Sequence, residues 1–185
     1  MPISNVFCLH GVPDIEQNTN NTIINWLEQL AFNYGITNVY KDCDSIEGFE
    51  ESLQTLIYED RAFNDYKLLY FVFKGRDQQI EIDNYYYTFE EIAEVFEGKL
   101  TDKIIHFANT INLDLDVDQA QYFLDITGAR ALSGYNKNAP ILSTVLDAPY
   151  FNLCQEEHDD VIDLVEHLHE KHYALCVSMG FVLYY

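Results

Sequence analysis

Apolar residues recur along this chain with two spacings, and each spacing predicts one type of secondary structure. Short apolar runs indicate buried β-strands, and the most continuous of them, Lys-Leu-Leu-Tyr-Phe-Val-Phe at 67–73, ends at Lys74 and Gly75. A run that is apolar on both faces is typical of a central strand in a parallel sheet. The pattern predicts about six strands, at residues 3–9, 38–41, 67–73, 103–107, 129–133 and 181–185.

Between these strands, apolar residues follow the three- and four-residue spacing of amphipathic helices. Thr88-Phe-Glu-Glu91 is a capping-box pattern that opens one of them, and glycines follow the last apolar residue of several. Helices are predicted at residues 23–34, 49–57, 89–96, 117–126 and 158–178. Residues 79–83 and 85–87 predict a small hairpin, whereas the less periodic stretch 140–154 predicts no regular element.

Strands that alternate with helices predict an α/β fold, here a three-layer sandwich with a mostly parallel central sheet of about six strands. The length of 185 residues suits a single domain, residues 1–185. In such sheets ligands bind beyond the carboxyl ends of the strands. The loops of interest therefore follow Leu9, Phe73, Phe107 and Ser133.

The charge of the chain narrows the range of partners. There are 31 Asp and Glu against 10 Lys and Arg, a formal charge of -21, so direct binding to nucleic acid or to an anionic membrane is not expected. The acidic residues are spread over several helices and loops, which favours solubility in a chain that is 48% hydrophobic. The longest apolar runs are far below the ~20 residues of a membrane span.

The cysteines indicate a compartment rather than a disulfide framework. Cys8, Cys43, Cys154 and Cys176 are scattered and form no CxxC pair. This spacing, together with a beginning that does not resemble a signal peptide, favours a reduced, cytoplasmic setting.

Several motifs of cofactor and metal chemistry do not occur in the sequence. GxxxxGK[ST], GxGxxG and GxSxG are absent, so no nucleotide cofactor and no nucleophile elbow are predicted. The His-Leu-His-Glu-Lys-His segment at 167–172 lacks the i, i+4 histidine pair of a metallopeptidase, and residues 114–125 have Gln119 where a calcium loop needs Gly. We expect histidines near a helix end in the first case, a loop that caps the next helix in the second, and a metal site in neither.

Basic and amide side chains gather instead at the predicted strand ends. Such a cluster could hold a carboxylate or phosphate group even in an acidic protein, because a partly enclosed site keeps its local potential. The predicted binding residues are Lys74, Gly75, Arg76, Asn109, Thr110, Asn112, Asn136 and Lys137.

These strand ends also carry a resemblance to a known family. The order of elements, Phe73-Lys74-Gly75 with its hairpin, Ile104-Ile-His-Phe107 and Gly128-Ala-Arg-Ala-Leu-Ser-Gly-Tyr135 together resemble the caspase-like domains of bacteria, and more narrowly small domains related to the CHAT peptidases. The resemblance runs over most of the chain. It implies a caspase-like fold and a bacterial defence or regulatory setting.

In that family a His-Gly pair follows the third strand and a Cys follows the fourth, since imidazole assists proton transfer while the thiolate attacks the carbonyl. Here Gly75 matches, but Lys74 stands at the His position and Thr110 at the Cys position. No cysteine lies between Cys43 and Cys154. The resemblance therefore implies a pseudo-peptidase that binds a protein or a small anionic ligand.

Two alternatives remain open at this stage. One is an active hydrolase in which Lys74 is the base and Thr110 the nucleophile, with His106 in its strand interpreted as a core or sheet-surface histidine. The other is an acidic mimic of nucleic acid that binds a basic protein. Tyr85-Tyr-Tyr87 would either supply contact area for a protein partner or fill the packing of the hairpin. The terminal strand or the hairpin could pair with a second copy, which leaves a homo-oligomer open.

Overall fold

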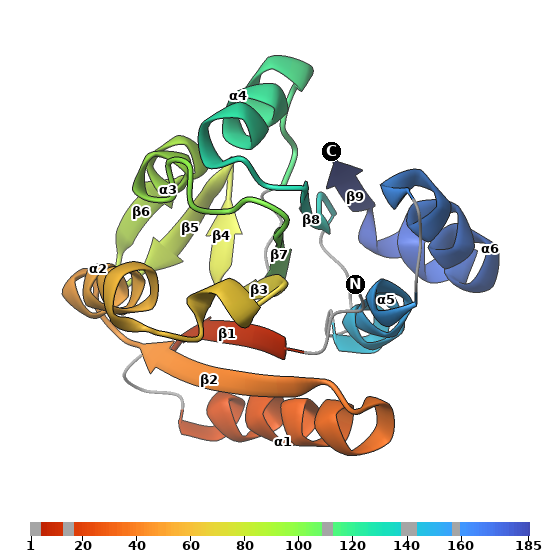
Figure 1. Ribbon diagram of the computed structural model, residues 1–185, viewed down its shortest axis with the longest axis horizontal. Helices are drawn as coiled ribbons and strands as arrows, with labels where there is room; N and C mark the ends of the chain where they lie inside the picture. Colours follow the sequence, from red (N-terminus) through yellow and green to blue (C-terminus); the bar gives the residue numbers. More distant parts are fainter. Residues whose placement is uncertain (1–4, 13–16, 109–112, 138–143, 157–159) are drawn as a thin grey trace.

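The computed structural model describes residues 5–12, 17–108, 113–137, 144–156 and 160–185. Six strands form the central sheet in the order β2-β1-β3-β7-β8-β9 (Figure 1). They are parallel except β9, which is antiparallel to β8. The strands of this sheet are β1 (Asn5–Gly11), β2 (Thr37–Cys43), β3 (Leu68–Val72), β7 (Ile104–Ala108), β8 (Ala131–Tyr135) and β9 (Phe181–Tyr184). The predicted mostly parallel sheet of six strands is confirmed.

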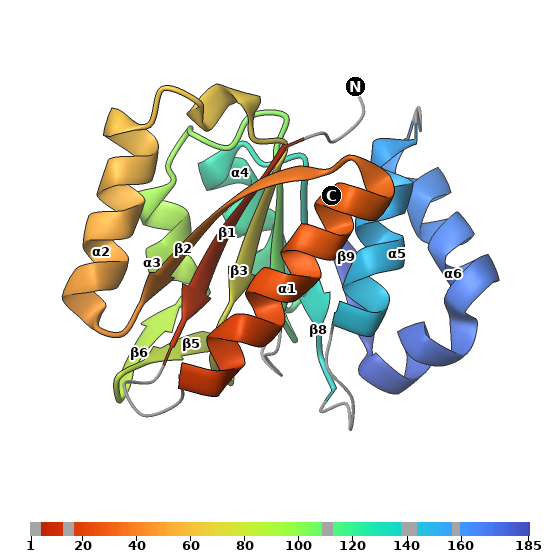
Figure 2. The ribbon, with the colours of Figure 1, turned by 90° about the horizontal axis from the view of Figure 1, so that it is seen from below.

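Helices cover both faces of this sheet, as Figure 2 shows. One apolar core packs α2, α3 and α4 against one face, and a second core packs α1, α5 and α6 against the other. The helices are α1 (Gln17–Tyr34), α2 (Ile46–Gln54), α3 (Phe89–Val95), α4 (Val117–Thr127), α5 (Thr144–Gln155) and α6 (Val161–Met179). A π-helical turn at Thr55–Glu59 and a 3₁₀ turn at Phe63–Asp65 lead into β3.

The central strand β3 explains why its run of apolar residues is continuous. All five of its residues are buried: Leu69 and Phe71 belong to one core, whereas Tyr70 and Val72 belong to the other. Successive side chains of a strand point to opposite faces, so a strand covered on both sides needs apolar residues at every position.

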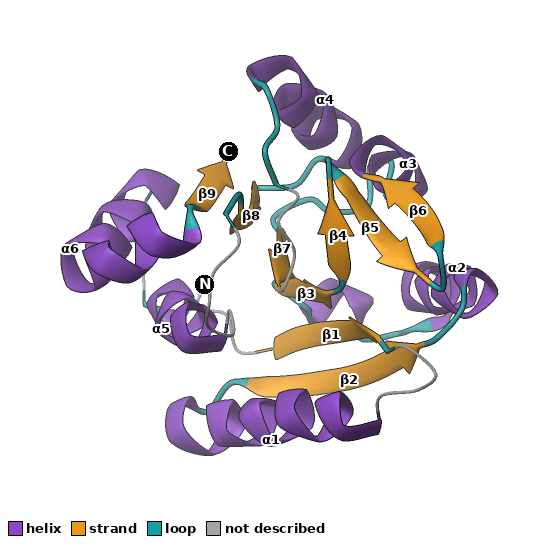
Figure 3. Ribbon diagram, turned by 180° about the vertical axis from the view of Figure 1, so that it is seen from behind, coloured by secondary structure: helices purple, strands orange, loops and turns teal. Residues whose placement is uncertain are grey.

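Strands β4 (Lys74–Arg76), β5 (Gln79–Ile82) and β6 (Tyr85–Thr88) form a separate antiparallel sheet, which lies beside α3 in Figure 3. The predicted hairpin corresponds to β5 and β6, and β4 adds a third strand directly after β3. Ile80 and Ile82 of β5 are buried in the core that contains α2, α3 and α4. The small sheet is therefore anchored by one apolar face.

The helix ends follow the predicted chemistry in several places. Thr88 and Glu91 form the capping box of α3, and Asp116 forms a second one with Gln119 at the start of α4. Gly128 and Gly180 end α4 and α6 with φ values of 72° and 61°, a conformation that favours glycine.

Helix α5 is the main element that the hydrophobic pattern did not predict. It contains Pro149, and its buried side chains include Asp147, Tyr150 and Phe151. A proline removes one backbone donor, and a helix buried on much of its circumference loses the amphipathic spacing that identifies a surface helix. Helix α6 begins at Val161 instead of residue 158, and its backbone is non-helical at His172.

Candidate functional site

The carboxyl ends of the parallel strands meet at one edge of the central sheet. Strands β3 and β7 pair directly in the middle of it, with Val72 opposite Ala108, and Phe73 N–H donates to the Ala108 carbonyl over 3.3 Å. Asn109, Thr110 and Asn112, which were predicted to follow β7, lie outside the described residues.

The first group of predicted binding residues lies on β4. Lys74 pairs with Glu81, Gly75 with Ile80 and Arg76 with Gln79. Since side chains alternate along a strand, Lys74 and Arg76 share the face of the small sheet opposite to the buried isoleucines.

Tyrosine side chains extend this exposed face. Glu81 is paired on its other side with Tyr86, which is 44% exposed. The Arg76 guanidinium lies 5.9 Å from the centre of the Tyr86 ring, and its Nη2 donates to the Tyr86 hydroxyl at 3.5 Å. We define the exposed face of the small sheet by Lys74, Arg76, Glu81 and Tyr86.

The second group of predicted binding residues has different neighbours. Asn136 N–H donates to the Gly180 carbonyl over 2.9 Å, and Lys137 Nζ donates to the Val177 carbonyl of α6 over 3.1 Å. These contacts place Asn136 and Lys137 beside the turn from α6 into β9. That one ligand contacts Lys137 together with Lys74 and Arg76 stays a prediction.

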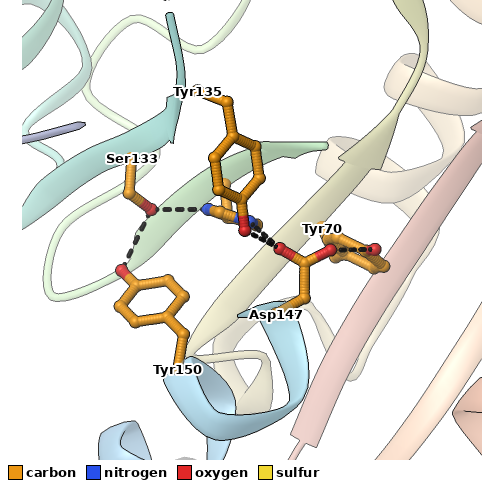
Figure 4. A network of polar contacts seen from close by, with 6 residues as sticks. Tyr70, Ser133, Tyr135, Asp147 and Tyr150 are labelled. Carbon is orange, nitrogen blue, oxygen red and sulfur yellow. Dashed lines mark hydrogen bonds and ion pairs between the residues drawn. The ribbon is translucent and has the colours of Figure 1, made fainter. Parts of the chain in front are cut away.

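Behind the strand ends, a polar network is enclosed in the core beneath α5 (Figure 4). His106 of β7 stands between Ser133 of β8 and Asp147 of α5: its Nδ1 lies 2.8 Å from Ser133 Oγ and its Nε2 lies 2.7 Å from Asp147 Oδ1. Tyr70 and Tyr135 donate to the Asp147 carboxylate over 2.7 Å and 2.5 Å.

Every donor of this network has an acceptor. Tyr150 of α5 donates to Ser133 Oγ over 2.9 Å. With its hydrogen on Nε2, His106 donates to Asp147 and accepts at Nδ1 from Ser133, so the chain of donors runs from Tyr150 through Ser133 and His106 to the carboxylate. Satisfied polar groups of this kind are what a buried network requires.

The network contains the residue types of a serine-hydrolase triad, but solvent does not reach them. His106, Ser133 and Asp147 are each 0% exposed. A nucleophile must approach the substrate carbonyl closely, whereas Ser133 is enclosed by α5 and the sheet. Burial, followed by the Asp147 charge, raises the pKa of Tyr70 and of Tyr135 well above the usual value. The arrangement joins α5 to β3, β7 and β8 and holds its hydroxyls protonated.

The four cysteine side chains are also buried. Burial is the main reason that the pKa of each thiol is raised, to about 12 for Cys43 and for Cys154 and well above the usual value for Cys8. The carboxylates of Asp42 and Asp44 add to the effect at Cys43. Because the thiolate is the nucleophilic form, burial and a raised pKa both disfavour reaction of these thiols in the folded protein.

One histidine does stand at the carboxyl end of a strand. His10 is the last residue but one of β1, is 6% exposed, and its Nδ1 lies 2.9 Å from the Tyr40 hydroxyl of β2. Burial lowers the pKa of His10, although the nearby Asp42 opposes this. His10 and Tyr40 are thus in contact between β1 and β2, near the carboxyl end of β1.

The remaining sequence candidates have structural contacts. Asp116 accepts a hydrogen bond from Gln119 N–H and caps α4, as expected for the acidic loop. His167 Nδ1 lies 2.7 Å from the Asp163 carbonyl within α6, and the His169 ring contacts Tyr173. In the described ranges no group of three potential ligands is placed to hold a metal ion. None of the helices in those ranges has the length and apolar character of a bilayer crossing.

Comparison with known protein families identifies the family of this chain. The model of a family of unknown function, DUF6642, matches residues 4–185. The chain belongs to the DUF6642 family. No curated protein matches the DUF6642 chain by sequence.

Solved structures identify the fold of this DUF6642 protein. It is similar to the crystal structure of the Drosophila initiator caspase Dronc, with a TM-score of 0.54 and 12% identity over 92% of this chain and 74% of that one. It is likewise similar to the structure of pro-sf-caspase-1, with a TM-score of 0.58 and 12% identity over 94% of this chain and 81% of that one. The fold is caspase-like.

Sequence reasoning missed most of the buried network of this DUF6642 chain. His106 was interpreted as a core or sheet-surface histidine and is buried in the core, but Asp147, Ser133 and Tyr150 were not singled out. The available signal was a lone carboxylate inside the apolar stretch Val-Leu-Asp-Ala at 145–148, since a buried charge requires a partner elsewhere in the core. An isolated His in an apolar strand is the natural candidate.

Proposed function

We propose that this caspase-like chain is catalytically inactive and binds a protein partner through the exposed face of its small sheet, Lys74, Arg76, Glu81 and Tyr86. The observation that carries the proposal is the environment of Lys74. It follows β3, where the resemblance to bacterial caspase-like and CHAT-related domains would place the catalytic histidine, and its side chain is exposed on β4.

The chemistry available elsewhere supports the proposal. The thiols are buried and protonated, and the Ser133, His106 and Asp147 set is enclosed in the core. Lysines that act as general bases are desolvated, whereas Lys74 lies exposed on β4. An active hydrolase that uses Lys74 and Thr110 is the competing outcome.

The exposed face has the composition of a recognition surface. Arginine and tyrosine are enriched at protein interfaces because they combine a large contact area with hydrogen bonding. Arg76 and Tyr86 are already in contact, so part of the entropy cost of ordering them is met before a partner binds.

An acidic hollow adjoins this face and suggests the character of the partner. It has a volume of about 400 Å³ and is lined in part by Asp77, Glu90, Asp116 and Asp118. No basic residue lines it. A partner segment that carries Lys or Arg beside an acidic or aromatic side chain would complement both features. The setting that the resemblance implies is a bacterial defence or regulatory system in the cytoplasm.

Two measurements test the proposal. Electrophilic probes for serine, threonine and cysteine nucleophiles should give no covalent adduct by intact mass, in the wild type or in Thr110→Ala. An adduct that forms on the wild type and is lost in Thr110→Ala or Lys74→Ala would establish the active hydrolase instead.

The binding half of the proposal uses a photo-crosslinking amino acid at position 86. We expect a discrete partner adduct in cells, which the double variant Lys74→Ala, Arg76→Ala abolishes. The control is the same crosslinker at Tyr173, another exposed tyrosine, on α6. Equal adducts from both positions would reject the small sheet as the binding surface.

A further inference from the structure

A second polar hollow lies by the amino ends of β3 and β7. This end of the central sheet is opposite to the carboxyl ends of the strands, where the small sheet begins. Its volume is about 610 Å³. It is lined by Ile57, Asp60, Arg61, Phe63, Asn64, Lys67, Gly98, Lys99, Thr101, Asp102 and Lys103. Only Ile57 and Phe63 in this lining are apolar, so the hollow offers little surface to a hydrocarbon chain or an aromatic base.

Positive charge is concentrated here to an unusual degree. Four of the ten basic residues of the whole chain line the hollow, against two carboxylates. The lining therefore carries an excess of two positive charges in a molecule of formal charge -21. Lys67 and Lys103 immediately precede two paired strands, so the sheet register holds them side by side.

Lys103 supplies a fixed charge in the wall of the hollow. It is 3% exposed, and its ammonium donates to the carbonyls of Phe63, Asn64 and Tyr66 at 2.8, 3.4 and 2.7 Å. These three carbonyls use all three of its donors. Burial and then the charge of Lys67 lower the pKa of Lys103, while Asp65 and Asp102 act in the opposite direction.

The other three cations keep donors available to a ligand. Lys99 lies 5.5 Å from the centre of the Tyr58 ring. Across the described ranges, no carboxylate forms an ion pair with Arg61, Lys67 or Lys99. Like charges grouped without ion-paired carboxylates repel one another, and a bound anion would relieve that repulsion.

The overall negative charge does not prevent this. At physiological ionic strength the Debye length is about 8 Å, so exposed carboxylates on the far side of the molecule are largely screened. The electrostatic energy of an anion inside the hollow therefore depends mainly on the charges of the lining residues.

We propose that this hollow binds a compact, multiply charged phosphate anion, held by Arg61, Lys67 and Lys99 in the field of Lys103. The guanidinium and the two ammonium groups match a di- or triphosphate group, which offers several charged oxygens over a short span. The group is either free or the phosphate chain of a nucleotide. The site is separate from the exposed face of the small sheet and does not depend on the proposed function.

Calorimetric titration of the whole chain at low salt tests the proposal, with sodium triphosphate, ATP and adenosine as separate ligands. We expect triphosphate to bind, ATP to bind with similar affinity, and adenosine not to bind. A triphosphate much weaker than ATP would overturn the proposal, because it would show recognition of the base. Binding of triphosphate should weaken as NaCl is raised.

Charge-matched variants locate the site. Lys67→Gln with Lys99→Gln should weaken triphosphate binding by about tenfold or more, since the variant loses two charged donors to the phosphate oxygens. Lys41→Gln with Lys171→Gln removes the same charge from exposed positions on β2 and α6 that do not line the hollow, and should leave binding unchanged. Circular dichroism checks that each variant is folded. No binding by the wild type, or equal loss in the control pair, would reject this site.

Discussion

Asp147 is the residue on which most of the buried polar contacts converge. Its two carboxylate oxygens accept from His106, Tyr70 and Tyr135, and the side chain is 0% exposed. An amide at this position keeps one acceptor oxygen and turns an N–H₂ group toward existing donors. Asp147→Asn should therefore lower the free energy of unfolding by about 3 kcal/mol, measured by urea denaturation.

Asp125→Asn is the matched control for this change. Asp125 is exposed on α4 and accepts one hydrogen bond from Gln121, so its replacement should change the free energy of unfolding by no more than about 0.5 kcal/mol. If Asp147→Asn proved equally mild, the network would not contribute to holding α5 against the sheet.

The buried thiols predict a second residue-level result. At pH 8 the folded protein should react with a disulfide reagent far more slowly than free cysteine does, because the pKa of Cys43 and of Cys154 is raised to about 12. In urea all four thiols should react at once. Rapid reaction of one thiol in the native protein would reveal an accessible thiolate and weaken the case for an inactive domain.

The same pKa shifts fix how stability depends on pH. A thiol titrates near pH 8.5 in the unfolded chain, so its burial contributes stability fully below that pH and loses it as pH rises toward the folded value. The buried tyrosines act in the same direction from about pH 10. The urea midpoint should fall steadily between pH 8 and 10.5, and a midpoint that rose would contradict the burial of these groups.

Contacts could be predicted from the sequence when the two partners lie close together along the chain, and could not when they lie far apart. The caps at Thr88 and Asp116 were predictable because the partner lies three residues along the same chain. The bond from His106 to Asp147 crosses 41 residues and depends on a helix that the sequence pattern did not reveal. Lys74, Gly75 and Arg76 were placed correctly after β3, but their location on a third strand of the small sheet was not predicted.

At the scale of elements, the turn from α6 into β9 predicts a strong steric effect at Gly180. Its φ is 61°, and a Cβ added there would lie 2.8 Å from Lys137 Cγ and closer still to the Asn136 amide oxygen. Gly35 has a φ of 68° with nothing within 4 Å of such a Cβ. Gly35→Ala should cost about 1–2 kcal/mol from its backbone alone, and Gly180→Ala clearly more, by thermal denaturation.

A second substitution separates the two causes at Gly180. In an Asn136→Ala background the clash with the amide is removed, so Gly180→Ala should become less destabilising and the two changes should be non-additive. Additive effects would mean that the Asn136 amide does not contribute to the cost.

Prediction of elements succeeded where the pattern had a clear period and failed where burial removed it. The strands of the central sheet and the helices α1 to α4 have either continuous apolar runs or one apolar face. Helix α5 contacts both α1 and α6. Its buried side chains belong to the core that also contains residues of these two helices and of the central sheet. A single periodicity cannot describe an element that is covered on most sides.

At the scale of the whole molecule, the charge of -21 predicts how stability responds to salt. Among the described residues no Lys or Arg forms an ion pair with a carboxylate, so screening weakens little attraction at the surface. It does reduce the repulsion among 31 acidic residues. The melting temperature should therefore rise by a few degrees as NaCl increases from about 20 to 300 mM.

Comparison of anions at equal ionic strength then separates general screening from a bound ligand. Choline chloride should match NaCl, because both act only through the ionic atmosphere. Triphosphate should raise the melting temperature further, and the extra rise should disappear in Lys67→Gln with Lys99→Gln while the NaCl effect persists. A melting temperature that fell with NaCl would mean that attraction between surface charges outweighs the repulsion among the carboxylates. Repulsion among Arg61, Lys67 and Lys99 in the absence of a bound anion would then lose its support.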